Sequence, residues 1–64
     1  MKLEFTVPNM ACSACGDTIT KAIQALDPSA LVQTDPKTKQ VRVDTSAAEP
    51  AVKQAITDAG YTVT

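Results

Sequence analysis

The spacing of the apolar residues switches along the chain between the period of two that suits a strand and the period near 3.6 that suits a helix. Apolar and polar residues alternate at the start, with one side formed by Leu3, Phe5 and Val7. This predicts a strand that ends at Pro8, because proline has no N–H to donate to a sheet. From Cys15 to Leu26 the apolar positions follow one stripe of a helix. That helix is expected to stop at Asp27, since the residue before a proline avoids helical backbone.

A hairpin is predicted in the middle of the chain. Alternating apolar residues indicate one strand over residues 30–34 and another over residues 40–44. The segment between them, residues 35–39, begins Asp-Pro and is typical of a turn. Lys37 and Lys39 lie in this turn and are expected to be solvated.

The last part of the chain is expected to form a second helix and a last strand. A second apolar stripe predicts a helix over residues 49–59, with Gly60 as its C-terminal stop. Two starts are open: Ser46 and Glu49 have the spacing of a capping box, whereas a later start places Pro50 in the first turn. Residues 61–63 are expected to form a short fourth strand.

The resulting order, β-α-β-β-α-β, predicts a ferredoxin-like α+β sandwich. Because strand–helix–strand units cross over right-handedly, both helices should cover one face of a four-stranded antiparallel sheet. We expect residues 1–64 to be a single domain with a small core. The two cysteines of the chain, Cys12 and Cys15, then fall in the loop between the first strand and the first helix, at an edge of the sheet.

Composition argues against several classes of function. Six basic and seven acidic residues give a formal net charge of -1, so no basic surface for nucleic acid or an anionic membrane is expected. The chain has no histidine to act as a base near neutral pH, and its acidic residues stand singly, which argues against an enzyme. Without a long apolar stretch or signal peptide before the first strand, we expect a cytoplasmic protein with no membrane-inserted segment.

The chemistry of the chain is concentrated at Cys12 and Cys15. Thiols stay free in a reducing cytosol, and residues three apart in a helical turn face the same way. Cys15 lies near the predicted helix N-terminus, where the helix dipole favours the thiolate, and Ser13 is a candidate N-cap. The spacing therefore indicates a dithiolate that acts in metal binding or redox chemistry.

The number of ligands favours Cu(I) as the metal. Thiolate is a soft ligand that selects Cu(I), zinc or iron–sulfur clusters, and structural zinc and clusters usually take four protein ligands. This chain has two cysteines and no histidine, which is enough for Cu(I) and leaves a position open for an incoming thiolate. Zinc or mercury binding, a dithiol oxidoreductase and an inert pair are the alternatives, although a thioredoxin-type enzyme needs a larger domain.

A known motif surrounds the cysteines. The Met-x-Cys-x-x-Cys motif of heavy-metal-associated domains resembles Met10-Ala11-Cys12-Ser13-Ala14-Cys15, and the family's C-terminal signature is similar to Asp58-Ala59-Gly60-Tyr61. The resemblance covers the whole chain and implies a bacterial type of copper chaperone that binds Cu(I) through Cys12 and Cys15. It also implies that Met10 packs inward beneath the loop and that Tyr61 lies near the metal. Ala11 departs from the common Thr or His, and it is not the Asp that often marks zinc-transporting relatives.

The same resemblance implies a partner, the soluble metal-binding domain of a copper-transporting P-type ATPase. Lys21 and Lys53, on predicted polar helix faces, would meet an acidic surface of that partner or else be ordinary solvated charges. Two copies that share copper through four thiolates would form a copper-bridged homodimer. A metal-binding domain detached from a Cu/Zn ATPase would show the same chemistry, although Met1 and the end at Thr64 favour a freestanding chain.

Overall fold

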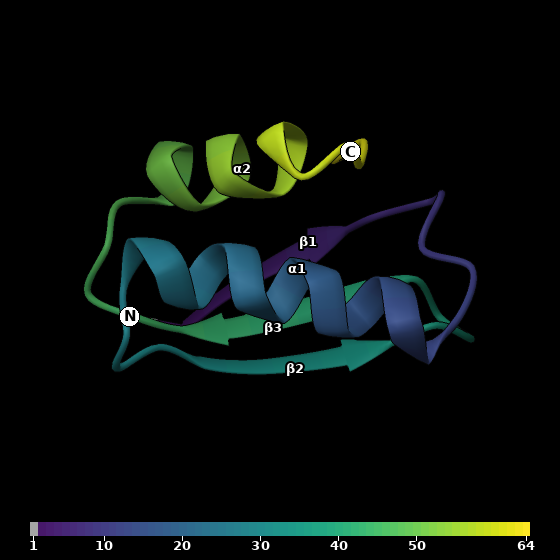
Figure 1. The fold of residues 1–64 in the computed structure, drawn as a ribbon, viewed down its shortest axis with the longest axis horizontal. Helices are drawn as coiled ribbons and strands as arrows, with labels where there is room; N and C mark the ends of the chain where they lie inside the picture. Colours follow the sequence, from purple (N-terminus) through teal and green to yellow (C-terminus); the bar gives the residue numbers. More distant parts are fainter. Residues whose placement is uncertain (1) are drawn as a thin grey trace.

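The computed structural model describes residues 2–64 and shows two helices packed against a sheet (Figure 1). Its elements follow the predicted order as far as the second helix: β1 (Lys2–Thr6), α1 (Ser13–Leu26), β2 (Leu31–Asp35), β3 (Gln40–Asp44) and α2 (Glu49–Asp58). Of the two starts left open for the second helix, the structure shows the later one, with Ala48 as N-cap and Pro50 in the first turn of α2. Neither helix in this part of the chain has the length and apolar character that crossing a bilayer requires.

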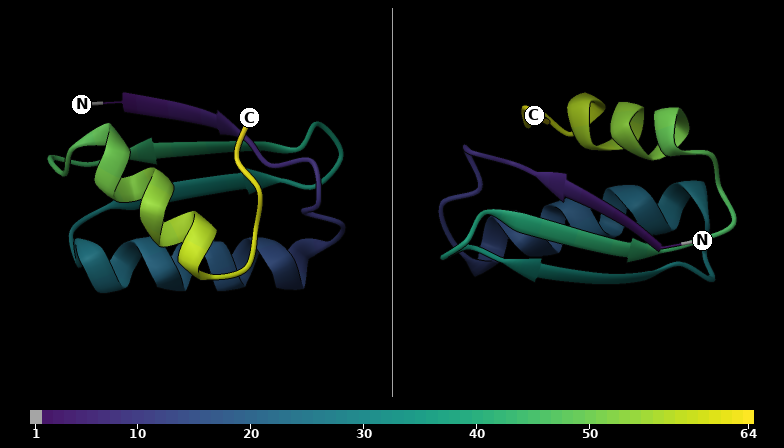
Figure 2. Two further views of the ribbon diagram at one scale, coloured as in Figure 1. Left: turned by 90° about the horizontal axis from the view of Figure 1, so that it is seen from above. Right: turned by 180° about the vertical axis from the view of Figure 1, so that it is seen from behind.

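The sheet is antiparallel with the order β1-β3-β2, so β3 lies in its middle. Phe5 stands opposite Val41 in the β1–β3 pair, and Val32 stands opposite Val43 in the β2–β3 pair. Because side chains alternate across a strand, these apolar residues share one face of the sheet. Both helices cover that face, with α2 crossing over α1 when the fold is seen from above (Figure 2).

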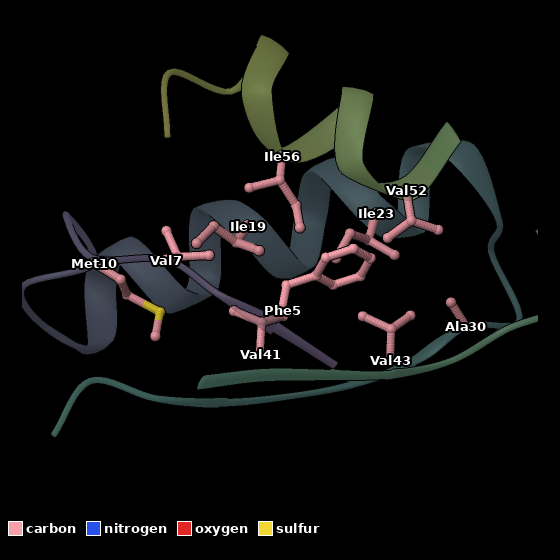
Figure 3. Packing of buried hydrophobic residues seen from close by; sticks show 10 residues of the cluster. All are labelled: Phe5, Val7, Met10, Ile19, Ile23, Ala30, Val41, Val43, Val52 and Ile56. Carbon is pink, nitrogen blue, oxygen red and sulfur yellow. The ribbon is translucent and has the colours of Figure 1, made fainter. Parts of the chain in front are cut away.

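The hydrophobic core fills the layer between the sheet and the two helices (Figure 3). Its buried members are Phe5, Val7, Met10, Ile19, Ile23, Ala30, Val41, Val43, Val52 and Ile56. Ile19 and Ile23 come from α1, whereas Val52 and Ile56 come from α2, so both predicted apolar stripes are confirmed. Full burial of a side chain of this size contributes about 1.5–3 kcal/mol, which makes this layer the main source of stability.

The predicted fourth strand over residues 61–63 is wrong, because the sheet within residues 2–64 has three strands. The C-terminal segment does run beside β1, where the Thr64 N–H donates to the Thr6 carbonyl at 2.9 Å. Nearer to α2, however, the Thr62 N–H donates to the side-chain oxygen of Asn9 at 3.0 Å rather than to a backbone carbonyl of β1. Pro8 has no N–H to offer, so a backbone ladder cannot continue past it. The ferredoxin-like arrangement of two helices on one face of an antiparallel sheet is retained.

A partly buried polar link joins the end of α1 to the segment that leads into α2. Asp27 is the C-cap residue of α1, and its carboxylate accepts a hydrogen bond from the Thr45 hydroxyl at 2.5 Å. The same carboxylate accepts from the N–H and the hydroxyl of Ser29, at 3.1 and 2.8 Å. These hydrogen bonds hold the pKa of Asp27 below the ordinary value of 3.8, and the bond from Thr45 contributes more than those from Ser29. Thr45 is only 5% exposed, so this link anchors α1 at its end away from the cysteines.

Candidate metal centre

Cys12 and Cys15 lie where the loop after β1 enters α1. Cys12 is the N-cap residue, and Cys15 lies in the first helical turn, where its N–H donates to the Cys12 carbonyl at 3.1 Å. Both thiols are free, and Cys12 is exposed whereas Cys15 is half-buried. Their Sγ atoms are 3.7 Å apart, so the fold brings the two sulfurs together. The prediction of Ser13 as N-cap is wrong, because Ser13 is already the first residue of α1.

The thiol of Cys15 is more acidic than that of an ordinary cysteine. A hydrogen bond with the Tyr61 hydroxyl contributes most, followed by the Ala11 backbone N–H and the Cys12 side chain, and the pKa falls from 9.0 to about 7. Partial burial opposes these bonds and raises the pKa, but by less. The lowered pKa raises the population of Cys15 thiolate at neutral pH, and the thiolate is the form that binds soft metal ions.

Tyr61 reaches Cys15 because the chain turns sharply after α2. Gly60 has a φ of 97°, a left-handed value that glycine adopts without strain, and the Tyr61 N–H donates back to the Ile56 carbonyl at 3.3 Å. The bond with Cys15 in turn raises the pKa of Tyr61, as expected for a hydroxyl that donates to a thiolate. The prediction that Tyr61 lies near the cysteine loop is confirmed.

Met10 forms the buried base of the loop. Its side chain has no solvent exposure and belongs to the hydrophobic core. In Figure 3 it stands at the end of the row of core side chains opposite to Val43 and Ala30. The prediction that Met10 packs inward is confirmed, and the loop that carries the cysteines rests on the core at this residue.

Lys39 contacts the cysteine loop, which the sequence did not indicate. Its Nζ donates to the Met10 carbonyl at 2.8 Å, and its own carbonyl accepts from the Val7 N–H at 2.8 Å. The expectation that Lys39 is a solvated turn residue is therefore wrong, whereas Lys37 in the same turn is exposed. A lysine in a turn has no sequence signal for such a contact, because it depends on two segments 29 residues apart.

Gly16 lets α1 lie close to the sheet directly behind Cys15. A Cβ at this position would fall 2.3 Å from Thr34 Oγ1 and 3.0 Å from Thr34 Cβ. Such distances are shorter than van der Waals contact, so only glycine permits this approach of α1 to β2. The depth of the first turn of α1, and with it the position of Cys15, is set by this contact.

The charged side chains of the described residues do not add a second metal centre. Within residues 2–64 no group of three or more His, Cys, Asp or Glu side chains is placed to hold a metal ion. Lys21 and Lys53 are exposed on α1 and α2. The centre that this geometry offers is therefore a pair of sulfurs, of which Cys15 has a lowered pKa because a tyrosine hydroxyl and a backbone N–H stabilise its thiolate.

Comparison with known proteins agrees with this geometry. The family model described as the heavy-metal-associated domain matches residues 4–62. A relative from Helicobacter pylori (strain J99), named COP-associated protein, is 34% identical over 65 residues, which is 98% of this chain and 98% of that protein.

Solved structures share the whole fold. A trimeric Cu1 form of a mutant of the copper chaperone Atx1 from Synechocystis PCC6803 has a TM-score of 0.94 and 40% identity, over 97% of this chain and 98% of that chain. The CopZ metallochaperone has a TM-score of 0.90 and 25% identity over the full length of both chains, 100% of each.

Proposed function

This chain belongs to the heavy-metal-associated domain family, and on that premise we propose that it carries one Cu(I) ion between the thiolates of Cys12 and Cys15. Copper is the cargo in this proposal, so no bond in a substrate is broken and the protein is a carrier rather than an enzyme. The proposal treats residues 1–64 as a single domain of the family. The similarity to the structure named copper chaperone Atx1 supports copper as the cargo, and the similarity to the CopZ metallochaperone supports the role of a metal carrier.

One observation carries the proposal: two free sulfurs lie 3.7 Å apart at the surface, and the pKa of one of them is about 7. A pair of thiolates suits a soft ion that accepts few ligands. The chain has no further cysteine and no histidine, so a structural zinc site with four ligands would need donors from elsewhere.

Release of the ion follows from the same features. Cys12 is exposed, so a thiolate of a partner can approach the ion from solvent and bind it as a further ligand. One thiolate of the carrier then leaves. The hydrogen bonds that lower the pKa of Cys15 also stabilise its thiolate after release, which favours its departure from the ion. Copper remains bound to sulfur throughout.

The acceptor that we propose is the soluble metal-binding domain of a copper-transporting P-type ATPase. Lys21 and Lys53 are exposed and carry charge that would complement an acidic partner surface. A second copy of this chain could supply two thiolates in the same way and form a copper-bridged homodimer. We place the protein in the cytoplasm, where a reducing environment keeps both thiols free.

Anaerobic titration of the reduced protein with Cu(I) and with Zn(II), against competing chelators, tests the cargo. We expect one Cu(I) per chain, held in preference to Zn(II), and loss of this binding in a variant that combines Cys12→Ser with Cys15→Ser. Ser13→Ala is the matched control, because it changes the same loop without removing a sulfur. Reduced protein that does not compete for Cu(I), or a double variant that still binds it, would refute the proposal.

The partners are tested separately from the cargo. Lys21→Glu combined with Lys53→Glu should weaken association with the ATPase domain and reduce its salt dependence, whereas Lys37→Glu should not. Equal association of both variants would exclude this docking surface. Sedimentation at rising copper loading tests the homodimer, and a monomer at every loading would rule it out.

A further inference from the structure

The backbone of Lys39 adopts a conformation that lysine seldom takes. Its φ of 64° lies in the left-handed region that glycine and asparagine usually fill. The turn before it is fixed by Asp35, whose Oδ1 accepts from the Lys37 N–H at 2.9 Å. The carbonyl of Lys39 is held by the Val7 N–H. Lys39 is therefore held in one backbone position beside the residues that lead into the cysteine loop.

The side chain of Lys39 bridges from the hairpin to this loop. Its Nζ donates to the Met10 carbonyl at 2.8 Å in a part-buried contact. The side chain of Met10 is itself fully buried in the core. Met10 is thus held at two points, by packing at its side chain and by a charge-assisted hydrogen bond at its carbonyl.

The carbonyl of Met10 and the N–H of Ala11 belong to one planar peptide unit. The Ala11 N–H hydrogen-bonds Cys15, so Lys39 and Cys15 lie at opposite ends of the same peptide. A rotation that turned the carbonyl away from Lys39 would also turn the N–H away from Cys15. A cation at the carbonyl further polarises the peptide and strengthens its N–H as a donor.

We infer that Lys39 is a positioning residue of the copper site, which orients and polarises the Met10–Ala11 peptide so that the Ala11 N–H faces the Cys15 sulfur. The inference rests on the proposed function and adds a residue to it. Two thiolates around one Cu(I) ion carry a net charge of about -1 by simple addition of the formal charges. A donor aimed at one of these sulfurs stabilises the loaded site without occupying a coordination position.

Lysine-to-methionine substitutions at two positions of the hairpin test the inference. Lys39→Met keeps a long unbranched side chain and the same backbone demand, but it removes the charge and the donor. Lys37→Met removes the same charge from the exposed side of the turn and is the matched control. Lys39→Arg retains a cationic donor and should restore the contact. Should Lys39→Met fail to fold, Lys39→Gln against Lys39→Arg gives the same comparison.

The first readout is the Ala11 amide in the reduced, copper-free protein, followed by NMR. In Lys39→Met we expect its hydrogen exchange to be about tenfold faster and its proton resonance to move upfield, as for the loss of one hydrogen bond. Lys37→Met and Lys39→Arg should leave both unchanged. The second readout is Cu(I) affinity by chelator competition, which we expect to fall about tenfold in Lys39→Met alone.

An Ala11 amide that is equally protected in Lys39→Met and Lys37→Met would overturn the inference. Unchanged Cu(I) affinity in Lys39→Met would overturn it as well, because the contact would then serve folding only. If the unaltered protein takes up no Cu(I), the proposed function fails on its own. The amide readout of the copper-free protein still decides in that case whether Lys39 orients the peptide.

Discussion

Replacement of Gly16 by alanine should destabilise the domain, although alanine is the better helix former. Helix propensity alone would make this change stabilising by about 1 kcal/mol. The new Cβ, however, would lie 2.3 Å from Thr34 Oγ1 and 3.0 Å from Thr34 Cβ. Rotation of the Thr34 side chain can move its hydroxyl but not its Cβ, so α1 must shift away from β2. Overpacking of this kind costs about 1–3 kcal/mol, which leaves a net loss of about 1 kcal/mol.

Urea unfolding of the reduced, metal-free protein, followed by far-UV circular dichroism, measures this loss. If the protein is unfolded by heat instead, a loss of 1 kcal/mol corresponds to a fall in Tm of roughly 4–8 °C for a domain of this size. Thr34→Ala removes the nearest atom, so the double variant should lose less stability than the sum of the two single variants. A Gly16→Ala protein that is more stable than the wild type would refute the steric argument, and so would strict additivity of the two substitutions.

Three further predictions concern the loop and the polar link. Tyr61→Phe removes the hydroxyl that bonds Cys15, so the pKa of this thiol should rise from about 7 toward 9.0. Carbon-13 NMR of the Cys15 Cβ measures this pKa. An unchanged pKa would mean that Tyr61 has only a packing role. Met10→Leu should lower the free energy of unfolding by less than about 1.5 kcal/mol and leave Cu(I) affinity unchanged, whereas Met10→Ala should lower the free energy of unfolding by about 2–5 kcal/mol. Weaker copper binding by a well-folded Met10→Leu protein would indicate that the thioether is a ligand. Asp27 has a pKa below 3.8, lowered first by Thr45, so its carboxylate stabilises the fold fully above pH 3.8 and this contribution is lost as the pH falls through the folded-state value. Acid unfolding should therefore remove less stability from Asp27→Asn than from the wild type, and equal losses would contradict this.

The periodicity of the sequence predicted the elements of the core because each apolar stripe faces one layer. Ile19 and Ile23 in α1, and Val41 and Val43 in β3, are buried as their spacing indicated. The fourth strand was predicted by the same local pattern, but strand formation depends on backbone partners that a local pattern does not contain. Pro8 has no N–H to donate to the C-terminal segment, and the Thr62 N–H donates to the Asn9 side chain instead of a backbone carbonyl of β1.

The pair of sulfurs was predictable because both belong to one short motif, whereas the groups around them come from distant segments. Tyr61 was anticipated near the loop through the family resemblance. The Ala11 N–H and Lys39 were not, because a backbone donor has no sequence signature and a turn lysine is solvated by default. The N-cap was placed one residue too late, since a serine side chain is the stronger capping signal even where, as at Cys12, backbone geometry decides the helix start.

The contact between Lys39 and Met10 also limits how this chain can be engineered. Tips of hairpins are the usual places to insert an affinity tag, a fluorophore or a linker, because they are exposed and tolerate added length. Here the tip between β2 and β3 is bonded to the cysteine loop, because Lys39 Nζ donates to the Met10 carbonyl at 2.8 Å. An insertion between Lys37 and Lys39 would therefore disturb the loop that carries the cysteines, although this loop is distant in the sequence. Fusion partners belong elsewhere on the surface.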